Sequence, residues 1–329
     1  MDSRPGAVPA VDCYLGVDIG GTKVLAGVVD VKGRVLRTAR RTTPGRRVDV
    51  RLVEDAVVEA VLEAAAGEPI SGVGVAAAGF VDADQSSVLF APHLPWQGED
   101  VCTRLEERWE APVVLDNDAN AAAVAELTFG AGVGAASLLL VTLGTGIGGC
   151  LVIGGRIHRG ANGMAGEFGH MQVVPGGFAC ECGRSGCWEQ YSSGHALVRY
   201  ARERLNREET VLEQWCDEQP DRLTGSMVAR AAAAGDRVAS DAFSFVGEWL
   251  GVGLANLTAA FDPHLIVVGG GVSAAGDLLI DPARTALNRS LVGAEHRLVP
   301  PVVVAELGPS AGLIGAATMA RERARSSGQ

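Results

Sequence analysis

Apolar segments separated by glycine turns dominate the first half of the chain. Residues 14–30 have the order apolar strand, glycine turn, apolar strand, and a hairpin turn at 31–34 leads to a third strand at 35–40. Residues 136–157 repeat the order strand, Gly/Thr turn, strand. This weak internal repeat predicts two similar α/β halves with a cleft between them, where ligands commonly bind.

The remaining pattern predicts alternating helices and strands, which is typical of an α/β protein. Apolar residues recur at helical spacing in segments 48–66, 99–109, 119–129, 194–215, 224–234, 238–260 and 311–323. Further buried strands are expected at 72–77, 112–118, 265–273 and 302–307. Residues 158–194 are glycine-rich and contain a cluster of cysteines, so we expect an irregular loop there.

Composition restricts the class of function. The chain has 329 residues, of which 47% are hydrophobic and 20% charged, as expected for a soluble enzyme of two domains. Its net charge of −11 argues against a nucleic-acid partner. No apolar segment reaches the ~18–20 residues of a membrane span. The N-terminus does not have the pattern of a signal peptide, so we expect no membrane association and a cytoplasmic location.

Three glycine clusters predict a nucleotide site. The segment Asp18–Lys23 lies between two apolar strands, and glycines there let backbone N–H groups approach an anion closely. Taken alone, it is better interpreted as an ordinary hairpin turn. A second turn at Gly144–Gly149 favours a polyphosphate held between two halves, and Gly269–Gly271 allows a flat base to approach. The expected nucleotide contacts are Asp18, Gly20, Gly21, Thr22, Lys23, Thr145, Gly146, Gly269, Gly270 and Gly271, with Asp18 also a candidate ligand of Mg²⁺.

One histidine and three cysteines have the spacing of a zinc site. His170, Cys180, Cys182 and Cys187 form the pattern H-x9-C-x-C-x4-C, a soft ligand set that suits tetrahedral Zn²⁺. The alternative, three free thiols in a loop, would be a redox liability. Four protein ligands leave no open position on the metal, so the zinc is expected to be structural.

Several polar residues are candidates for recognising and deprotonating a hydroxylated substrate. They are Asn117 and Asp118 after a strand, Glu167 and His170 in a glycine-flanked segment, and Glu189 after the last cysteine of the cluster. Asp and Asn are also favoured at helix N-termini, which is the alternative interpretation of residues 116–118. We expect Asp116 to be structural.

The motifs resemble those of a known family. Residues 180–194 agree with the signature C-x-C-G-x-x-G-C-x-E-x-x-x-S-G at every fixed position, and the three glycine segments resemble the nucleotide site of the actin–hexokinase–Hsp70 superfamily. The chain thus resembles the ROK family (repressor, open reading frame, kinase) over residues 14–322, and most closely its actinobacterial-type glucokinases. The resemblance implies a two-domain actin/hexokinase-like (ribonuclease H-like) α/β fold with a zinc-bound loop. The expected small domain is 12–117 plus 308–323, and the large domain is 118–307.

The resemblance also implies an activity and roles for residues. An ATP-dependent kinase with Mg²⁺ would phosphorylate a sugar, with glucose the first expectation, and Asp118 would be the catalytic base. The sugar contacts would come from the residues that match the family motifs: Ala78, Gly79, Asn117, Asp118, Glu167, His170 and Glu189. The chain departs from the family in the loop 74–79, where Ala76 replaces Gly and Ala78 replaces Pro, and at His93, where Asn is common.

Several alternatives stay open at this point. Other ROK kinases act on N-acetylmannosamine, N-acetylglucosamine, mannose or fructose, and sequence spacing does not separate them. The donor could be polyphosphate. A non-catalytic sugar sensor is a further hypothesis, against which Asp118, the two glycine turns and the lack of a DNA-binding region argue. A zinc-stabilised structural protein is another, although it leaves the carboxylates unexplained. By resemblance to the family we expect a homodimer or homotetramer.

Overall fold

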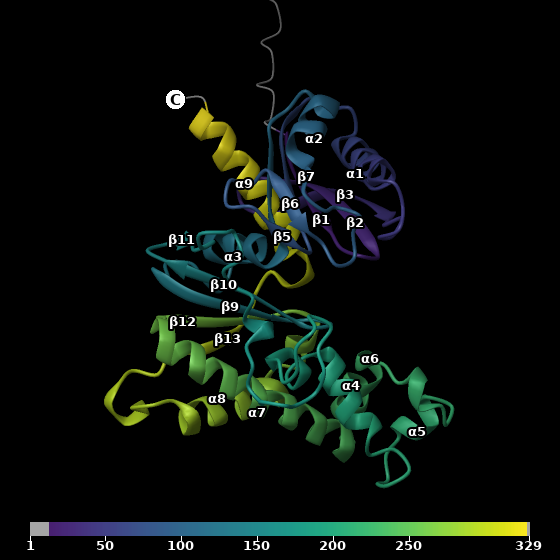
Figure 1. Ribbon diagram of the computed structural model, residues 1–329, viewed down its shortest axis with the longest axis vertical. Helices are drawn as coiled ribbons and strands as arrows, with labels where there is room; N and C mark the ends of the chain where they lie inside the picture. The colour runs from purple at the N-terminus through teal and green to yellow at the C-terminus, as the bar shows by residue number, and fades with distance from the viewer. Residues whose placement is uncertain (1–12, 328–329) are drawn as a thin grey trace, which may run out of the picture. The chain divides into compact units, whose positions relative to one another are not determined.

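The computed structural model describes residues 13–327, which form two compact units (Figure 1). The first unit contains the described residues up to Ala125, together with 160–164 and the chain from Ser310 onward. The second unit contains Glu126–Arg159 and Ala165–Pro309. This division and the domains expected from the sequence differ mainly over 118–125 and 160–164, which belong to the first unit. The expected first residue of the small domain, 12, lies outside the described range.

A five-stranded sheet forms the centre of the first unit, with the order β3-β2-β1-β4-β8. β1 is antiparallel to β2 and β2 to β3, whereas β1, β4 and β8 run parallel to one another. The carboxyl ends of these three parallel strands therefore meet at one edge of the sheet, the usual location of ligand sites in α/β proteins. The strands are Cys13–Ile19 (β1), Lys23–Val29 (β2), Val35–Thr42 (β3), Ile70–Ala77 (β4) and Val113–Asn117 (β8).

The two faces of this sheet carry residues of different size. Helices α1 (Val50–Ala65) and α2 (Val101–Trp109) share a core with large side chains such as Leu15 and Leu115. The opposite face carries Gly16, Gly74 and Ala76 beside Tyr14 and Val114, and it packs with α9 (Ala311–Ser327) and the start of α3 (Asp118–Phe129). A Cβ atom on Gly16 or on Gly74 would lie 1.9 Å from a carbonyl oxygen of α9. Glycine in β1 and β4 thus allows the backbone of α9 to lie directly on the sheet.

The second unit repeats the topology of the first. Its five-stranded sheet has the order β11-β10-β9-β12-β13, with two antiparallel pairs followed by two parallel pairs. The strands are Ser137–Leu143 (β9), Ile147–Ile153 (β10), Arg156–Ile157 (β11), Leu265–Gly269 (β12) and Val302–Val304 (β13). The internal repeat predicted from the sequence is therefore confirmed at the level of strand order and direction.

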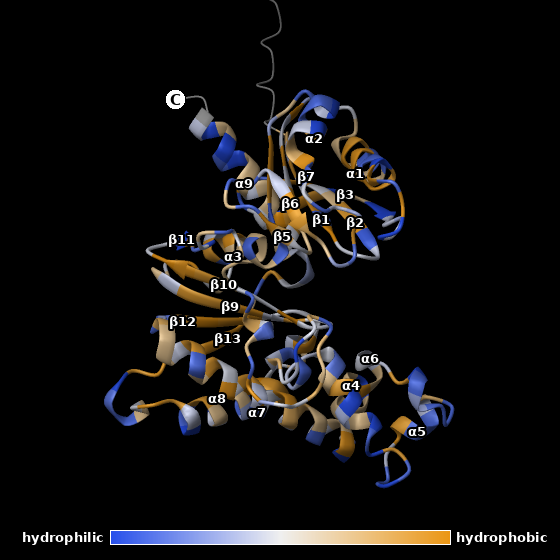
Figure 2. Ribbon diagram, in the orientation of Figure 1, coloured by the Kyte–Doolittle hydropathy of each residue, from blue (hydrophilic) through white to orange (hydrophobic). Residues whose placement is uncertain are grey.

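Helices of the second unit pack on its sheet through a large apolar core. They are α4 (Gly194–Arg202), α5 (Leu212–Trp215), α6 (Gly225–Ala233), α7 (Arg237–Phe261) and α8 (Asp277–Ser290). In Figure 2 the sheet strands β9, β12 and β13 are largely hydrophobic, whereas the helices alternate between hydrophobic and hydrophilic positions. None of the helices within residues 13–327 has the length and apolarity that crossing a bilayer requires.

Four predicted elements differ from the structure. The helix expected at 194–215 is interrupted, because Asn206 has a φ of 61° and the surrounding charged residues offer few apolar contacts. The strand expected at 265–273 ends at Gly269, and that expected at 302–307 ends at Val304. The helix expected at 99–109 starts at Val101, because Glu99–Asp100 form strand β7. β7 belongs to a three-stranded sheet with Phe80–Val81 (β5) and Ser87–Phe90 (β6), neither of which the pattern predicted.

Helix α8 is a further element that the pattern did not predict. Pro282 lies inside it, and proline normally argues against a helix interior. The helix is stabilised by close packing on α7: a Cβ atom on Gly251 would lie 2.3 Å from the carbonyl oxygen of Ala283. The other short elements are 3-10 turns at Phe168–His170, Trp188–Gln190, Pro220–Arg222, Gly271–Ala275, Ala294–His296 and Gly308–Ser310.

Candidate functional site

The first glycine turn, Gly20–Thr22, joins β1 to β2 and is held by hydrogen bonds to its carbonyl groups. The hydroxyl of Thr43 donates to the carbonyl of Gly20 at 2.7 Å, and the amide of Thr43 donates to that of Thr22 at 3.2 Å. Among residues 13–327, the amides of Gly21 and Thr22 have no acceptor. The turn therefore offers two N–H donors to an anion, as a phosphate site requires.

Asp18 and Lys23 form an ion pair across this turn. Their Oδ2 and Nζ atoms are 3.5 Å apart, and the side chain of Asp18 is only 21% exposed. Burial raises the pKa of Asp18, and the nearby charge and hydrogen bond of Lys23 act in the opposite direction. The pair places one anionic and one cationic group beside the free amides, a suitable arrangement for a phosphate with its metal ion.

Two hydrogen bonds connect the strand end before this turn with the other predicted residues of the first unit. The amide of Ala78 donates to the carbonyl of Ile19 at 3.1 Å. The side-chain amide of Asn117 donates to the carbonyl of Gly79 at 3.0 Å. The ends of β1, β4 and β8 are thus linked, and the predicted sugar loop lies between the phosphate turn and the Asn117–Asp118 segment.

The segment before α3 is fixed by a buried carboxylate. Asp116 is 2% exposed and accepts hydrogen bonds from the side chains of Gln85 and Asn120 and from the amide of Asn117. Asp118 is the first residue of α3, and its Oδ1 accepts the amide of Ala119 at 2.8 Å. Asp116 therefore has the structural role expected of it, and it sets the position of the two residues that follow.

The second glycine turn, Gly144–Gly146, lies between β9 and β10 and next to the third glycine cluster. Its Gly144 carbonyl accepts the amide of Gly194, the first residue of α4, at 2.8 Å. Gly270 has a φ of 83°, and a Cβ atom there would lie 2.3 Å from the carbonyl oxygen of Leu143. Because β9 and β12 are parallel neighbours, their carboxyl ends bring Gly269–Gly271 against the turn. Two of the predicted nucleotide segments therefore meet within the second unit.

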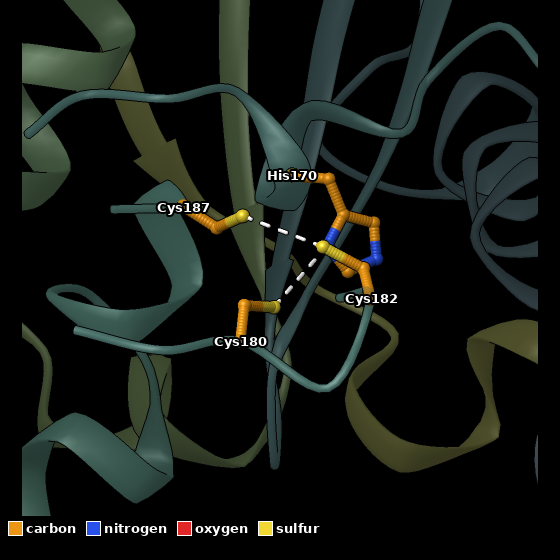
Figure 3. Close-up of side chains that lie close together, drawn as sticks. All are labelled: His170, Cys180, Cys182 and Cys187. Carbon is orange, nitrogen blue, oxygen red and sulfur yellow. Dashed lines mark hydrogen bonds between the residues drawn. The ribbon is translucent and has the colours of Figure 1, made fainter. Parts of the chain in front are cut away.

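The predicted zinc ligands lie together in the second unit (Figure 3). One ligand atom from each of the four residues His170, Cys180, Cys182 and Cys187 lies within 4.8 Å of all the others. The Sγ atoms of Cys182 and Cys187 are 3.6 Å apart, and Cys180 Sγ is 3.7 Å from His170 Nδ1. A tetrahedral Zn²⁺ with Zn–S bonds of about 2.3 Å has S···S edges of about 3.8 Å. These distances and the donor set fit a zinc ion.

Positive backbone angles allow the cysteine loop to fold this tightly. Gly183 and Gly186 have φ values of 84° and 78°. A Cβ atom on Gly186 would also lie 1.7 Å from the carbonyl oxygen of Val174. The amide of Gly183 donates to the carbonyl of Cys180 at 3.0 Å, which closes the turn between the first two cysteines. The glycines of the motif are thus needed by the backbone that carries the thiols.

Two carboxylates lie beside the imidazole of His170. Glu189 Oε1 is 3.6 Å from His170 Nδ1 and 3.0 Å from Cys180 Sγ. Glu167 Oε2 is 3.9 Å from His170 Nε2, the ring nitrogen that does not face the thiols. Burial raises the pKa of Glu167; His170 lowers it, and Glu189 raises it further. Three polar groups therefore converge on one location beside the metal cluster, as recognition of a hydroxylated ligand requires.

Glu189 also contacts the second phosphate turn. A Cβ atom on Gly146 would lie 2.2 Å from Glu189 Oε2. The carboxylate therefore lies between the turn on one side and Cys180 and His170 on the other. This contact links the predicted zinc ligands to the predicted nucleotide segment of the same unit.

Sequence reasoning missed two residues of the first unit that hold the phosphate turn. Thr43 was not recognised, because a threonine at the end of a strand has no distinctive spacing. His93 had a signal in the sequence, since the resemblance to the family implies asparagine at this position, and its side chain packs on Gly21. The predicted residues thus form two groups, one in each unit. The first group is Asp18, Gly20–Lys23, Ala78, Gly79, Asn117 and Asp118; the second is Thr145, Gly146, Glu167, His170, the three cysteines, Glu189 and Gly269–Gly271.

Comparison with known proteins gives the family. Residues 14–323 match the ROK family, and the chain belongs to it. A glucokinase of Streptomyces coelicolor is 47% identical over 311 residues, which cover 94% of this chain and 97% of that protein. The fold is that of solved ROK structures, including a glucokinase from Streptomyces griseus in complex with glucose and AMPPNP (47% identity, TM-score 0.86, 94% of this chain and 99% of that one). A ROK hexokinase from Thermus thermophilus has 35% identity and a TM-score of 0.75, with 95% and 99% of the two chains covered.

Proposed function

We propose that this protein phosphorylates glucose with ATP and forms glucose 6-phosphate and ADP. The observation that carries the proposal is the junction of three strand ends in the first unit. Ala78 bonds to Ile19, the residue before the turn Gly20–Thr22, and Asn117 bonds to Gly79. Such a junction supplies donors for phosphate beside a carboxylate that can accept a proton. The similarity to a glucokinase that binds glucose and AMPPNP supports the same substrates.

The proposed chemistry assigns Asp118 as the general base. The 6-hydroxyl oxygen of glucose forms a bond to the γ-phosphorus of ATP, the bond from this phosphorus to the bridging oxygen of ADP breaks, and the hydroxyl proton moves to the carboxylate of Asp118. The amides of Gly21, Thr22, Thr145 and Gly146 would hold phosphate oxygens. Asp18 would hold Mg²⁺, which neutralises charge on the phosphates when bound. Asn117 and the loop at Ala78–Gly79 in the first unit, and Glu167, His170 and Glu189 in the second, would bind sugar hydroxyls.

The proposed zinc site would act by holding the side chain of His170 in a fixed orientation. His170 Nδ1 and the sulfurs of Cys180, Cys182 and Cys187 would hold the ion, whose four bonds leave no site for substrate. Binding through Nδ1 leaves His170 Nε2 directed at Glu167. These two groups could then share one sugar hydroxyl, with Nε2–H as donor and the carboxylate as acceptor.

The proposal is tested by measuring ADP release in a coupled assay with a panel of hexoses and N-acetylhexosamines. Glucose should give the highest kcat/KM, and ADP release should need sugar. Polyphosphate replaces ATP in a parallel series, where formation of glucose 6-phosphate would make it the alternative donor. A higher kcat/KM for another sugar would contradict glucose as the substrate. ADP release that does not depend on any sugar would contradict the proposed sugar kinase activity.

Asp118→Asn tests the general base. We expect kcat to fall by about 10²- to 10⁴-fold, because the amide cannot take the proton. The matched control is Asp277→Asn, since Asp277 is also the first residue of a helix and is exposed. The control should keep wild-type turnover, and near-normal turnover of Asp118→Asn would remove Asp118 from the role.

Two further parts of the proposal concern assembly and location. We expect a homodimer or homotetramer in the cytoplasm, on the basis of the resemblance to the family. Light scattering after gel filtration measures the mass of the assembly, and a monomer at the concentrations of the kinase assay would contradict it.

A further inference from the structure

The segment 90–93 connects the two predicted substrate loops of the first unit. At one end it lies against the sugar loop: a Cβ atom on Gly79 would lie 2.8 Å from the carbonyl oxygen of Phe90 and 3.0 Å from the Cα atom of Ala91. At the other end it lies against the phosphate turn, since a Cβ atom on Gly21 would lie 2.7 Å from His93 Cβ and 3.2 Å from its Cγ. His93 therefore extends from the sugar side onto the turn that would hold the nucleotide.

Contacts on the opposite side of the turn fix the position of this segment. Thr43 bonds the carbonyls of Gly20 and Thr22, and the chain then continues to Arg46. The guanidinium of Arg46 donates to the carbonyl of Pro92 at 3.4 Å. These contacts run from the turn through Thr43, Arg46 and Pro92 to His93 and back to Gly21. The bond of Arg46 to Pro92 therefore helps to hold the residue before His93 next to the turn.

The imidazole of His93 has no polar partner among the described residues. His93 is exposed, and within residues 13–327 its ring has no hydrogen bond or ion pair. The other charged groups at the turn are the ion pair of Asp18 with Lys23 and the guanidinium of Arg46. The ring lies against the position that a Cβ atom on Gly21 would take. The amides of Gly21 and Thr22 in the same turn also lack acceptors in this range.

We propose that His93 donates a hydrogen bond to the terminal phosphoryl group of the nucleotide bound on the Gly20–Thr22 turn. The inference rests on the proposed function, because it assumes that the turn holds the end of a triphosphate next to the sugar. An imidazole on the turn, two residues from the contact of Ala91 with the sugar loop, would reach the phosphoryl group nearest the sugar and leave the rest of the nucleotide untouched. His93 is then a substrate-contacting residue that this chain has in place of the family's usual asparagine.

The test compares two nucleotides that differ in the γ-phosphoryl group. Calorimetry measures the Kd of AMPPNP and of ADP, each with Mg²⁺ and glucose, for the wild type, His93→Ala and His93→Asn. Loss of one hydrogen bond to a charged group weakens binding by about 10- to 100-fold. We expect this loss for AMPPNP with His93→Ala, little change for ADP, and a smaller loss for His93→Asn, because the amide is a shorter donor. His296→Ala is the matched control, a histidine whose side chain is 82% exposed.

Each result decides the proposal. Equal weakening of AMPPNP and ADP, or no change in either, would show that His93 only packs on Gly21 and would overturn the inference. A change in the KM of glucose alone would assign His93 to the sugar and would also overturn it. The binding comparison needs no turnover, so an inactive wild type would count against the proposed function alone. If His93→Ala does not fold, as judged by thermal unfolding, the comparison is decided with His93→Asn.

Discussion

A single methyl group on the second phosphate turn should displace the carboxylate of Glu189. In Gly146→Ala the new Cβ atom would lie 2.2 Å from Glu189 Oε2, whereas real Cβ contacts essentially never fall below 3.0 Å. Glu189 cannot turn away freely, because its other oxygen lies 3.0 Å from Cys180 Sγ and 3.6 Å from His170 Nδ1. The carboxylate must therefore move by about 1 Å, a displacement that can cost about 100-fold in rate when it misplaces a substrate.

The expected result is a loss of about 100-fold in kcat/KM for glucose, equivalent to about 2.7 kcal/mol of transition-state stabilisation. The assay is coupled ADP release at saturating ATP, with thermal unfolding measured in parallel to exclude loss of the fold. The control is Gly144→Ala in the same turn, where a Cβ atom would have no neighbour within 4 Å. This control should stay within a few-fold of the wild type.

A double-mutant cycle shows whether the loss of kcat/KM in Gly146→Ala comes from displacement of Glu189 or from a changed contact with the nucleotide. In a Glu189→Ala background the carboxylate is absent, so adding Gly146→Ala should cost little more. A loss that is as large in this background as in the wild type would refute the reasoning and assign the effect to the phosphate contact. Equal losses for Gly144→Ala and Gly146→Ala would refute it as well.

Two further predictions concern the metal cluster and the charge at the first turn. Cys180→Ser should lose zinc, lower the Tm and raise the KM for glucose together, because the cysteine is a proposed zinc ligand. The control is Cys216→Ala, which changes a buried thiol outside the cluster and should retain zinc. Mass spectrometry measures the zinc content, and full retention of zinc by Cys180→Ser would contradict the assignment of Cys180 as a ligand. Because burial raises the pKa of Asp18, its carboxylate takes up a proton as the pH falls through that value, and kcat/KM for ATP should decline on the acid side. Lys23→Met removes the charge that lowers this pKa, so the acid limb of the pH profile should move to higher pH; an unchanged position would contradict this role.

Local motifs of the sequence predicted those parts of the site that depend on short segments. The cysteine cluster has this character, because His170 and the three cysteines lie within one loop whose glycines enforce its shape. The repeat of strand, glycine turn and strand in the two halves was also predictable, since apolar segments and glycine turns mark it in the sequence. The order of the strands within each sheet was not predicted. The contact of His93 with Gly21 and that of Glu189 with Gly146 were not predictable. Both join segments that are far apart in the sequence and leave no periodic pattern.

The missed elements have a common physical reason. Helix α8 contains Pro282, and its stability comes from close contact with Gly247 and Gly251 of α7, which no local pattern in α8 records. The end of β12 at Gly269 is likewise set by its neighbour, because Gly270 packs on the carbonyl of Leu143. Tertiary contacts therefore determine helix α8 and the end of β12, whereas local sequence preference determines the elements that the pattern predicted.

Glycine also sets the position of the proposed base relative to the first phosphate turn. On one side of α9, Gly16 and Gly74 of the sheet let the helix lie so close that a Cβ atom would fall 1.9 Å from its carbonyl oxygens. On its other side, a Cβ atom on Gly315 would fall 1.7 Å from the carbonyl oxygen of Ala121 in α3. Helix α9 is thus packed backbone to backbone against both β1 and α3. Since β1 leads into the turn at Gly20 and α3 begins at Asp118, these main-chain contacts fix the distance between the proposed phosphate donors and the proposed base.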